Sequence, residues 1–262
     1  MWSDIHMKKL VLCLGSGGIR GFTHIGVLKA LEENHLQVQA FFGTSVGSLV
    51  SVFSASGLTA SQIEKIALSL GIFDLLDLTF PQNGFIKGIK LKKIIQKHVL
   101  QKNIQDLLVP VCITATHSKT GGLILFETGE ISERVQASCA IPNIFRPVTI
   151  DQIEYLDGDL KSPVPMKIAR EAYQNDVILG VNIIARIDQA PRNHRLWSKW
   201  ISKDIYRRSL VDHETKYADL YMDIDIGFTG SFCGDWPQKQ IQTGYVETLK
   251  IIPKLKQLLV TV

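Results

Sequence analysis

Short apolar runs, glycine-rich turns and amphipathic stretches follow one another in the N-terminal part of the chain. Residues 8–14 form an apolar run that ends at a glycine, as a buried strand does, and residues 22–35 have apolar positions at helical spacing. Residues 38–42 are a second apolar run, followed by another glycine turn and by the small, apolar stretch 49–56. A strand, turn and helix repeated in this order predict parallel strands covered by helices.

The rest of the chain continues this mixture of periodicities without an internal repeat, a low-complexity tract or a change in composition. Further helices are predicted over residues 61–70, 91–100, 131–140, 195–210 and 241–259, and further strands over residues 109–116, 123–127, 150–156, 177–184 and 220–226. We therefore expect an α/β fold with a mostly parallel central sheet, formed by a single domain over residues 8–262. Residues 1–7 are interpreted as a leader that does not belong to this domain.

The composition is that of a globular chain with a sizeable core. Hydrophobic residues make up 45% and charged residues 21% of the sequence, and the formal net charge of +4 is too small to indicate a nucleic-acid partner. Four widely spaced cysteines without a CxxC pair indicate neither a metal site nor a disulfide framework. No apolar run reaches the roughly 18 residues of a membrane span, and no signal-peptide core is present. We therefore expect a cytoplasmic protein.

Ser45 lies in the sequence Gly43-Thr44-Ser45-Val46-Gly47, the G-x-S-x-G pattern of a nucleophile elbow. Such a serine stands on a sharp turn from a strand to a helix, where the glycines permit a strained backbone and close packing. The alternative is a glycine turn whose serine only caps the following helix. The position of Ser45 between a predicted strand and a predicted helix favours the nucleophile.

A second glycine-rich turn, residues 15–21, precedes the first predicted helix. Acyl transfer needs donors for the developing oxyanion, and the backbone N–H groups of Gly17 and Gly18 have no side chains in their way. A dinucleotide fingerprint is the rival interpretation, but its third glycine falls on Arg20, and no acidic residue follows at the required distance. The turn therefore favours an oxyanion hole.

The group that activates Ser45 is either a histidine or a carboxylate. An ordinary hydrolase would use His194 or His213, but neither lies in a turn-marked loop, and exposed or capping roles account for both. Asp157 is followed by Gly158 after a predicted strand, so a tight turn there can present its carboxylate to the site. Asp157 is therefore a candidate base beside the two histidines.

Three ordered motifs make this sequence resemble the patatin-like phospholipase family, in particular its short bacterial members. The resemblance spans roughly residues 8–180 and includes the segments 23–28 and 137–148 as well. The motifs are Gly17-Gly18-Ile19-Arg20-Gly21, Gly43-Thr44-Ser45-Val46-Gly47 and Asp157-Gly158-Asp159.

The resemblance implies a three-layer patatin-like fold and a lipid acyl hydrolase with a Ser–Asp dyad. Ser45 would be the nucleophile, Asp157 its base, and the Gly17 and Gly18 amides the oxyanion donors, with no catalytic histidine, metal or cofactor. The substrate would be a phospholipid, a lysophospholipid or another acyl ester. The residues expected to support these motifs are Gly15, Arg20, Gly21, Gly43, Gly47 and Gly158.

Two positions depart from the family pattern. Ser16 stands where many relatives have glycine, and Asp159 replaces the small third residue of the D-G-G motif. Asp159 either raises the pKa of Asp157 by repulsion or pairs with Lys161 at the surface, and we favour the surface pair. If Asp159 spoils the dyad, the chain is a catalytically silent lipid- or acyl-binding protein on the same scaffold.

The stretch Arg192–Lys216 is basic and amphipathic, with seven basic and three acidic residues and the aromatic side chains Trp197, Trp200 and Tyr206. Such a helix either lies on the inner face of the membrane or packs on the core through its apolar side. Arg20 likewise either supports its loop, which we favour, or contacts a lipid phosphate. The sequence does not indicate an oligomeric state.

Overall fold

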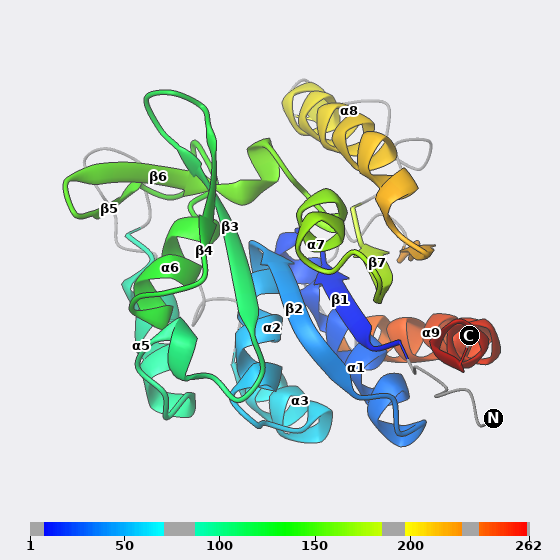
Figure 1. Cartoon of the computed structure of the whole chain (residues 1–262). Helices are drawn as coiled ribbons and strands as arrows, with labels where there is room; N and C mark the ends of the chain where they lie inside the picture. The colour runs from blue at the N-terminus through cyan, green and yellow to red at the C-terminus, as the bar shows by residue number, and fades with distance from the viewer. Residues whose placement is uncertain (1–7, 71–86, 185–196, 227–235, 261–262) are drawn as a thin grey trace.

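The computed structural model describes residues 8–70, 87–184, 197–226 and 236–260, and for residues 197–201 it describes the backbone alone. An eight-stranded sheet occupies the middle of this part, in the order β5-β6-β3-β2-β1-β7-β8, with β4 added to β3 (Figure 1). The strands are β1 (Leu10–Leu14), β2 (Val38–Thr44), β3 (Val111–His117), β4 (Leu123–Phe126), β5 (Val148–Ile150), β6 (Ile153–Asp157), β7 (Val177–Asn182) and β8 (Leu220–Asp223).

The strands from β3 through β2, β1 and β7 to β8 run parallel, whereas β4 and β6 pair antiparallel with β3, and β5 antiparallel with β6. Helices lie on both faces of the sheet (Figure 1). They are α1 (Phe22–Glu33), α2 (Val46–Ala55), α3 (Ala60–Ser69), α5 (Ile89–His98), α6 (Ile131–Ser138), α7 (Met166–Ala172), α8 (Trp197–Glu214) and α9 (Trp236–Val260).

The central strand β1 shows why the fold has three layers. Leu10, Leu12 and Leu14 pack into one core with α1, α2, α3 and α9, while Val11 and Cys13 pack into a second core with α7 and α8. All five side chains are buried, which explains the continuous apolar run of a parallel strand covered on both faces. The predicted α/β class with a mostly parallel central sheet is confirmed.

One predicted strand is wrong and one helix was not predicted. Residues 150–156 do not form a single strand, because the chain reverses at Asp151 and Gln152, between β5 and β6. Both turn residues have positive φ, 50° and 67°, as a tight two-residue hairpin requires. Such turns usually contain glycine or asparagine, so Gln152 gave no signal of a reversal. Helix α7 is short, and its amphipathic period is correspondingly weak.

Helices α1 and α9 approach so closely that their contact depends on glycine. A Cβ atom on Gly26 would lie 1.9 Å from the carbonyl oxygen of Ile241, and one on Gly244 would lie 2.1 Å from that of Thr23. Because both obstacles are backbone atoms, neither can move aside without shifting a helix.

Replacing Gly26 with Ala is therefore expected to lower the free energy of unfolding by about 3 kcal/mol, since overpacking separates the two helices. Urea denaturation followed by circular dichroism measures the loss. Gly122→Ala is the control, because its Cβ would meet only the Thr120 hydroxyl, at 3.3 Å, in a surface turn. Equal stability of the two variants would contradict this account of the α1–α9 contact.

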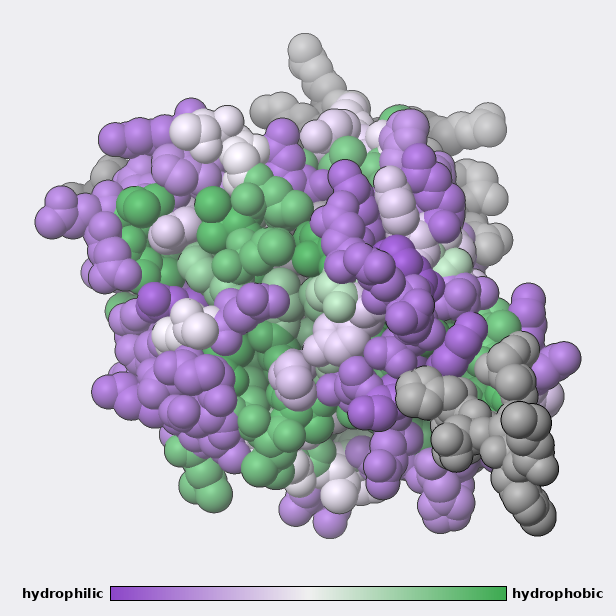
Figure 2. All heavy atoms as spheres, in the orientation of Figure 1, coloured by the Kyte–Doolittle hydropathy of each residue, from purple (hydrophilic) through white to green (hydrophobic). Residues whose placement is uncertain are grey.

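The face of the sheet around β3 and β4 is less completely covered by helices. Apolar side chains gather in the middle of this face (Figure 2). On β4, Leu123 and Leu125 are 38% and 44% exposed. None of the helices in the described ranges combines the length and the apolar character needed to cross a bilayer.

Candidate active site

Ser45 stands on the turn between β2 and α2 in a strained conformation. Its φ of 55° and ψ of −125° are unusual for a residue with a side chain. The turn is tight enough that a Cβ atom on Gly43 would lie 2.5 Å from Ser48 Cα, and one on Gly47 2.1 Å from the carbonyl oxygen of Leu14. The Ser45 hydroxyl does not cap α2, which removes the helix-capping interpretation.

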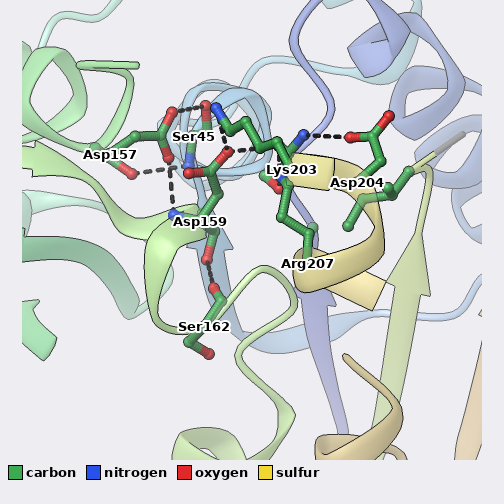
Figure 3. A network of polar contacts seen from close by, with 12 residues as sticks. Ser45, Asp157, Asp159, Ser162, Lys203, Asp204 and Arg207 are labelled. Atoms are coloured by element: carbon green, nitrogen blue, oxygen red, sulfur yellow. Dashed lines mark hydrogen bonds and ion pairs between the residues drawn. The ribbon is translucent and has the colours of Figure 1, made fainter. Parts of the chain in front are cut away.

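The Ser45 hydroxyl donates a hydrogen bond to the Asp157 carboxylate instead. Oγ and Oδ2 are 2.7 Å apart, although the two residues are 112 positions apart in the sequence (Figure 3). Asp157 ends β6, is fully buried, and accepts a second hydrogen bond through Oδ1 from the Asp159 N–H, at 2.9 Å. A Cβ atom on Gly158 would lie 2.3 Å from Thr114 Oγ1, so glycine allows the turn to pack against β3.

The surroundings of Asp157 make its carboxylate a stronger base than an ordinary one. Burial, followed by the negative charge of Asp159, raises the pKa of Asp157, while the hydrogen bonds from Asp159 and Ser45 and the charge of Arg207 oppose the increase. An ordinary aspartate, with a pKa near 4, accepts protons poorly at neutral pH. A raised pKa brings Asp157 closer to the range in which a general base works.

The glycine-rich loop lies against the Ser45 turn. A Cβ atom on Gly21 would lie 2.1 Å from Val46 Cγ2, and one on Gly15 would lie 2.7 Å from Val164 Cγ2. The Gly15 and Ser16 amides donate to the carbonyl oxygens of Val181 and Pro163, which fixes the start of the loop.

Gly17 and Gly18 differ from the residues before them. Within the described part of the chain, neither amide donates a hydrogen bond. Gly18 has a φ of 57°, and a Cβ atom there would meet nothing within 4 Å, so no other atom crowds this side of the loop. Two adjacent N–H groups of this kind are suitable donors for an oxyanion.

The end of α6 closes another side of the site. Ser138 Oγ accepts a hydrogen bond from the Ser45 N–H at 2.8 Å, so this amide is engaged. The Cys139 thiol lies near the Ser45 and Ser48 hydroxyls, and desolvation together with the Asp157 charge raises its pKa. Cys139 therefore remains a neutral thiol and does not compete with Ser45 as a nucleophile.

The model of the patatin-like phospholipase family matches residues 12–170, well over half of the chain. This chain belongs to the patatin-like phospholipase family. The matched segment includes the glycine-rich loop, Ser45 and Asp157, but ends before α8.

Sequence relatives come from bacteria and eukaryotes. An uncharacterised NTE family protein of Mycobacterium tuberculosis is 32% identical over 161 residues, which cover 60% of this chain and 44% of the relative. The human patatin-like phospholipase domain-containing protein 6 is 30% identical, over 64% of this chain and 13% of its own. Lysophospholipase NTE1 of Cryptococcus neoformans is 28% identical, over 71% and 12%. The matched part is thus less than half the length of these curated relatives.

Solved structures share the fold at low sequence identity. VipD from Legionella pneumophila aligns with a TM-score of 0.64 at 15% identity, over 95% of this chain and 67% of its own. The type III effector protein ExoU aligns with a TM-score of 0.54 at 13% identity, over 97% and 54%. The expected patatin-like fold is therefore confirmed.

The structure corrects the predicted ion pair of Asp159. Its carboxylate is fully buried, and Oδ2 lies 2.6 Å from Arg207 Nη2 and 3.5 Å from Lys203 Nζ (Figure 3). The expected surface pair with Lys161 is wrong, because the Lys161 side chain lies beside Gly121 instead. The error arose because cations about 45 residues further along the chain, on α8, reach Asp159 from the other side of the turn.

His24 is a site residue that the analysis of the sequence did not single out. Its ring is fully buried on α1, and Nε2 lies 2.8 Å from the Gly15 carbonyl oxygen. Burial lowers the pKa of His24 to about 4, so the neutral ring donates from Nε2 and holds the start of the glycine-rich loop. A histidine two residues into a helix that follows a glycine-rich turn was the available signal.

Of the two histidines considered as rival bases, the structure describes only His213, which does not join the site. His213 is exposed near the end of α8, and none of the described hydrogen bonds or ion pairs involves its ring. His194, Cys233 and the side chains of Trp197 and Trp200 lie outside the described residues. Within the described ranges, no group of histidine, cysteine and acidic side chains is arranged to hold a metal ion.

Proposed function

We propose that this chain is a lipid acyl hydrolase in which Ser45 is the nucleophile and Asp157 the general base. The observation that carries the proposal is the 2.7 Å hydrogen bond from a strained elbow serine to a buried carboxylate. In ordinary serine hydrolases a histidine receives the proton, whereas here the carboxylate contacts the hydroxyl directly. Membership of the patatin-like phospholipase family supports this interpretation.

The reaction follows from the positions of these groups. Ser45 Oγ attacks the ester carbonyl carbon while its proton passes to Asp157 Oδ2, and the Gly17 and Gly18 amides donate to the oxyanion. Collapse of the tetrahedral intermediate breaks the ester bond, and Asp157 returns the proton to the leaving alcohol. Water then attacks the acyl-serine, again with Asp157 as base, which releases the fatty acid and restores the Ser45 hydroxyl.

The substrate class we propose is a phospholipid or lysophospholipid. One relative is named a lysophospholipase, and the chain belongs to the patatin-like phospholipase family.

Contact of residues 192–216 with the inner face of a membrane stays a prediction. The described basic side chains of α8 face inward in part, since Lys203 and Arg207 contact Asp159, and Arg208 lies 3.3 Å from Asp223. Ile205 and Tyr206, 51% and 46% exposed, remain on the outer side.

Fatty-acid release from lysophosphatidylcholine and phosphatidylcholine vesicles tests the proposed function, and the pH profile tests the base. Because the pKa of Asp157 is raised to about 8, and only the deprotonated carboxylate accepts a proton, kcat/KM should rise from pH 6 and level off above pH 8. An ordinary carboxylate would give a flat profile over this range. A flat profile, or no fatty acid released from either lipid, contradicts the proposal.

A further inference from the structure

Arg207 joins two parts of the site that are far apart in the sequence. Its Nη2 atom lies 2.9 Å from Ser16 Oγ, in the glycine-rich loop, and 2.6 Å from Asp159 Oδ2, in the turn after the base (Figure 3). Nη1 lies 3.1 Å from Asp204 Oδ1 on the same helix, and the Arg207 side chain is only 9% exposed. The guanidinium is thus held among three polar groups with little access to solvent.

Each of the two contacts leads directly to a reacting group. Ser16 immediately precedes Gly17 and Gly18, and its own amide is bound to the Pro163 carbonyl oxygen at 2.8 Å. Asp159 donates its N–H to the Asp157 carboxylate at 2.9 Å. A displacement of Arg207 would therefore disturb two features. One is the loop that carries the Gly17 and Gly18 amides, and the other is the hydrogen bond from the Asp159 N–H to Asp157.

The charged and polar groups around Asp157 come from four elements. Asp159 lies in its own turn, Arg207 and Lys203 approach from α8, Cys139 ends α6, and the Ser45 hydroxyl stands before α2. Two buried carboxylates this close would repel each other strongly without a cation. Arg207 supplies that cation, with Lys203 as a second, more distant one.

By the resemblance described above, Ser16 and Asp159 are also the two positions at which this chain departs from the family motifs. Both departures contact the same guanidinium atom, and that atom belongs to a helix beyond the segment matched by the family model. The three residues therefore form a single unit that the family motifs do not include.

We propose that Arg207 is a positioning residue, which ties the glycine-rich loop to the turn of the base and offsets the charge of Asp159 beside Asp157. The proposal rests on the Ser45–Asp157 mechanism described above. Arg207 does not touch the reacting atoms. It acts through Ser16 on the oxyanion donors and through Asp159 on the base.

The experiment compares Arg207→Met with Arg208→Met, using the hydrolysis of lysophosphatidylcholine between pH 6 and 10. Arg208 is a matched control, because it is the next residue on α8 and pairs with Asp223 rather than with Asp159. Arg207→Met should lower kcat about 10- to 100-fold and move the rising limb of the profile up by about one pH unit. In Arg208→Met, kcat should rise over the same pH range as in the wild-type protein.

Two further variants separate the electrostatic role from the tethering role. In the double variant Arg207→Met/Asp159→Asn, kcat should rise with pH over nearly the same range as in the wild-type protein, because the negative charge at position 159 is gone. Arg207→Lys should keep the rising part of the profile at the wild-type pH but lower kcat, because lysine has no second nitrogen to contact Asp204 while the first contacts Ser16 and Asp159. Arg207→Lys also serves as the test if Arg207→Met does not fold.

Three outcomes are decisive. If the wild-type protein is active and kcat rises over the same pH range in Arg207→Met and Arg208→Met, the positioning role is wrong, and the proposed function still stands. A wild-type kcat in Arg207→Lys overturns the tethering role. A folded wild-type protein that releases no fatty acid overturns the proposed function, and the positioning role fails with it.

Discussion

Replacing Ser45 with Ala will remove covalent labelling by a fluorophosphonate probe and lower ester hydrolysis by about 10⁴-fold or more. The phosphonate reacts only with an activated hydroxyl, and Ser45 is the residue whose hydroxyl is hydrogen-bonded to a buried carboxylate. Mass mapping of the labelled peptide identifies the modified residue. Fatty-acid release measured on the same preparations gives the loss of activity.

Ser51→Ala is the matched control for this result. Ser51 lies on α2, the helix that follows Ser45, is fully buried, and its hydroxyl has no hydrogen-bond partner in the described part of the chain. The control should label and hydrolyse as the wild-type protein does. If a folded wild-type protein does not label, the chain is better explained as the silent lipid- or acyl-binding protein, and binding of a fluorescent lysophospholipid becomes the next measurement.

The sequence was sufficient to predict the turns that carry Ser45 and Asp157, because each turn depends on residues that are neighbours in the chain. Glycine at positions 43 and 47 around a serine, between an apolar run and a helical period, leaves few other structures for the chain to adopt. The same holds for the turn at Gly158, where packing against Thr114 excludes a side chain. Local patterns of this kind place Ser45 and Asp157, although they lie 112 residues apart.

The partners of Asp159 could not be predicted in this way. Its pairing with Arg207 depends on how α8 crosses the site, and in the sequence α8 is separated from the turn of the base by α7 and β7. A basic amphipathic helix has the same sequence pattern whether its charges face lipid or a buried carboxylate. Long-range ion pairs leave no periodic signal, which is why Lys161, the nearest cation in the sequence, was the wrong choice.

Replacing Asp157 with Asn will lower kcat by about 10³- to 10⁴-fold while the protein remains folded. Asparagine has nearly the same shape, and its side-chain oxygen can still accept the hydrogen bond from the Asp159 N–H. The amide cannot accept the proton of Ser45, so attack on the ester loses its base. Labelling by the fluorophosphonate should become correspondingly slow.

Asp151→Asn is the matched control for the loss of one carboxylate. Asp151 lies in the β5–β6 hairpin turn, its side chain is 87% exposed, and asparagine tolerates its positive φ. This variant should keep the kcat of the wild-type protein. If Asp157→Asn also retains activity within tenfold, Asp157 is not the base.

Stability measured on Asp157→Asn separates a catalytic role from a structural one. Because burial raises the folded-state pKa of Asp157 above its unfolded value, the folded protein favours the protonated carboxyl. The wild-type protein should therefore lose stability as pH rises from about 4 toward 8, since the unfolded chain releases this proton first. Asparagine carries no charge to desolvate, so the variant should melt at the same temperature as the wild-type protein or higher above pH 8. A nearly inactive variant of equal or greater stability indicates that the buried charge is kept for its chemistry, whereas a lower melting temperature would make Asp157 a structural residue.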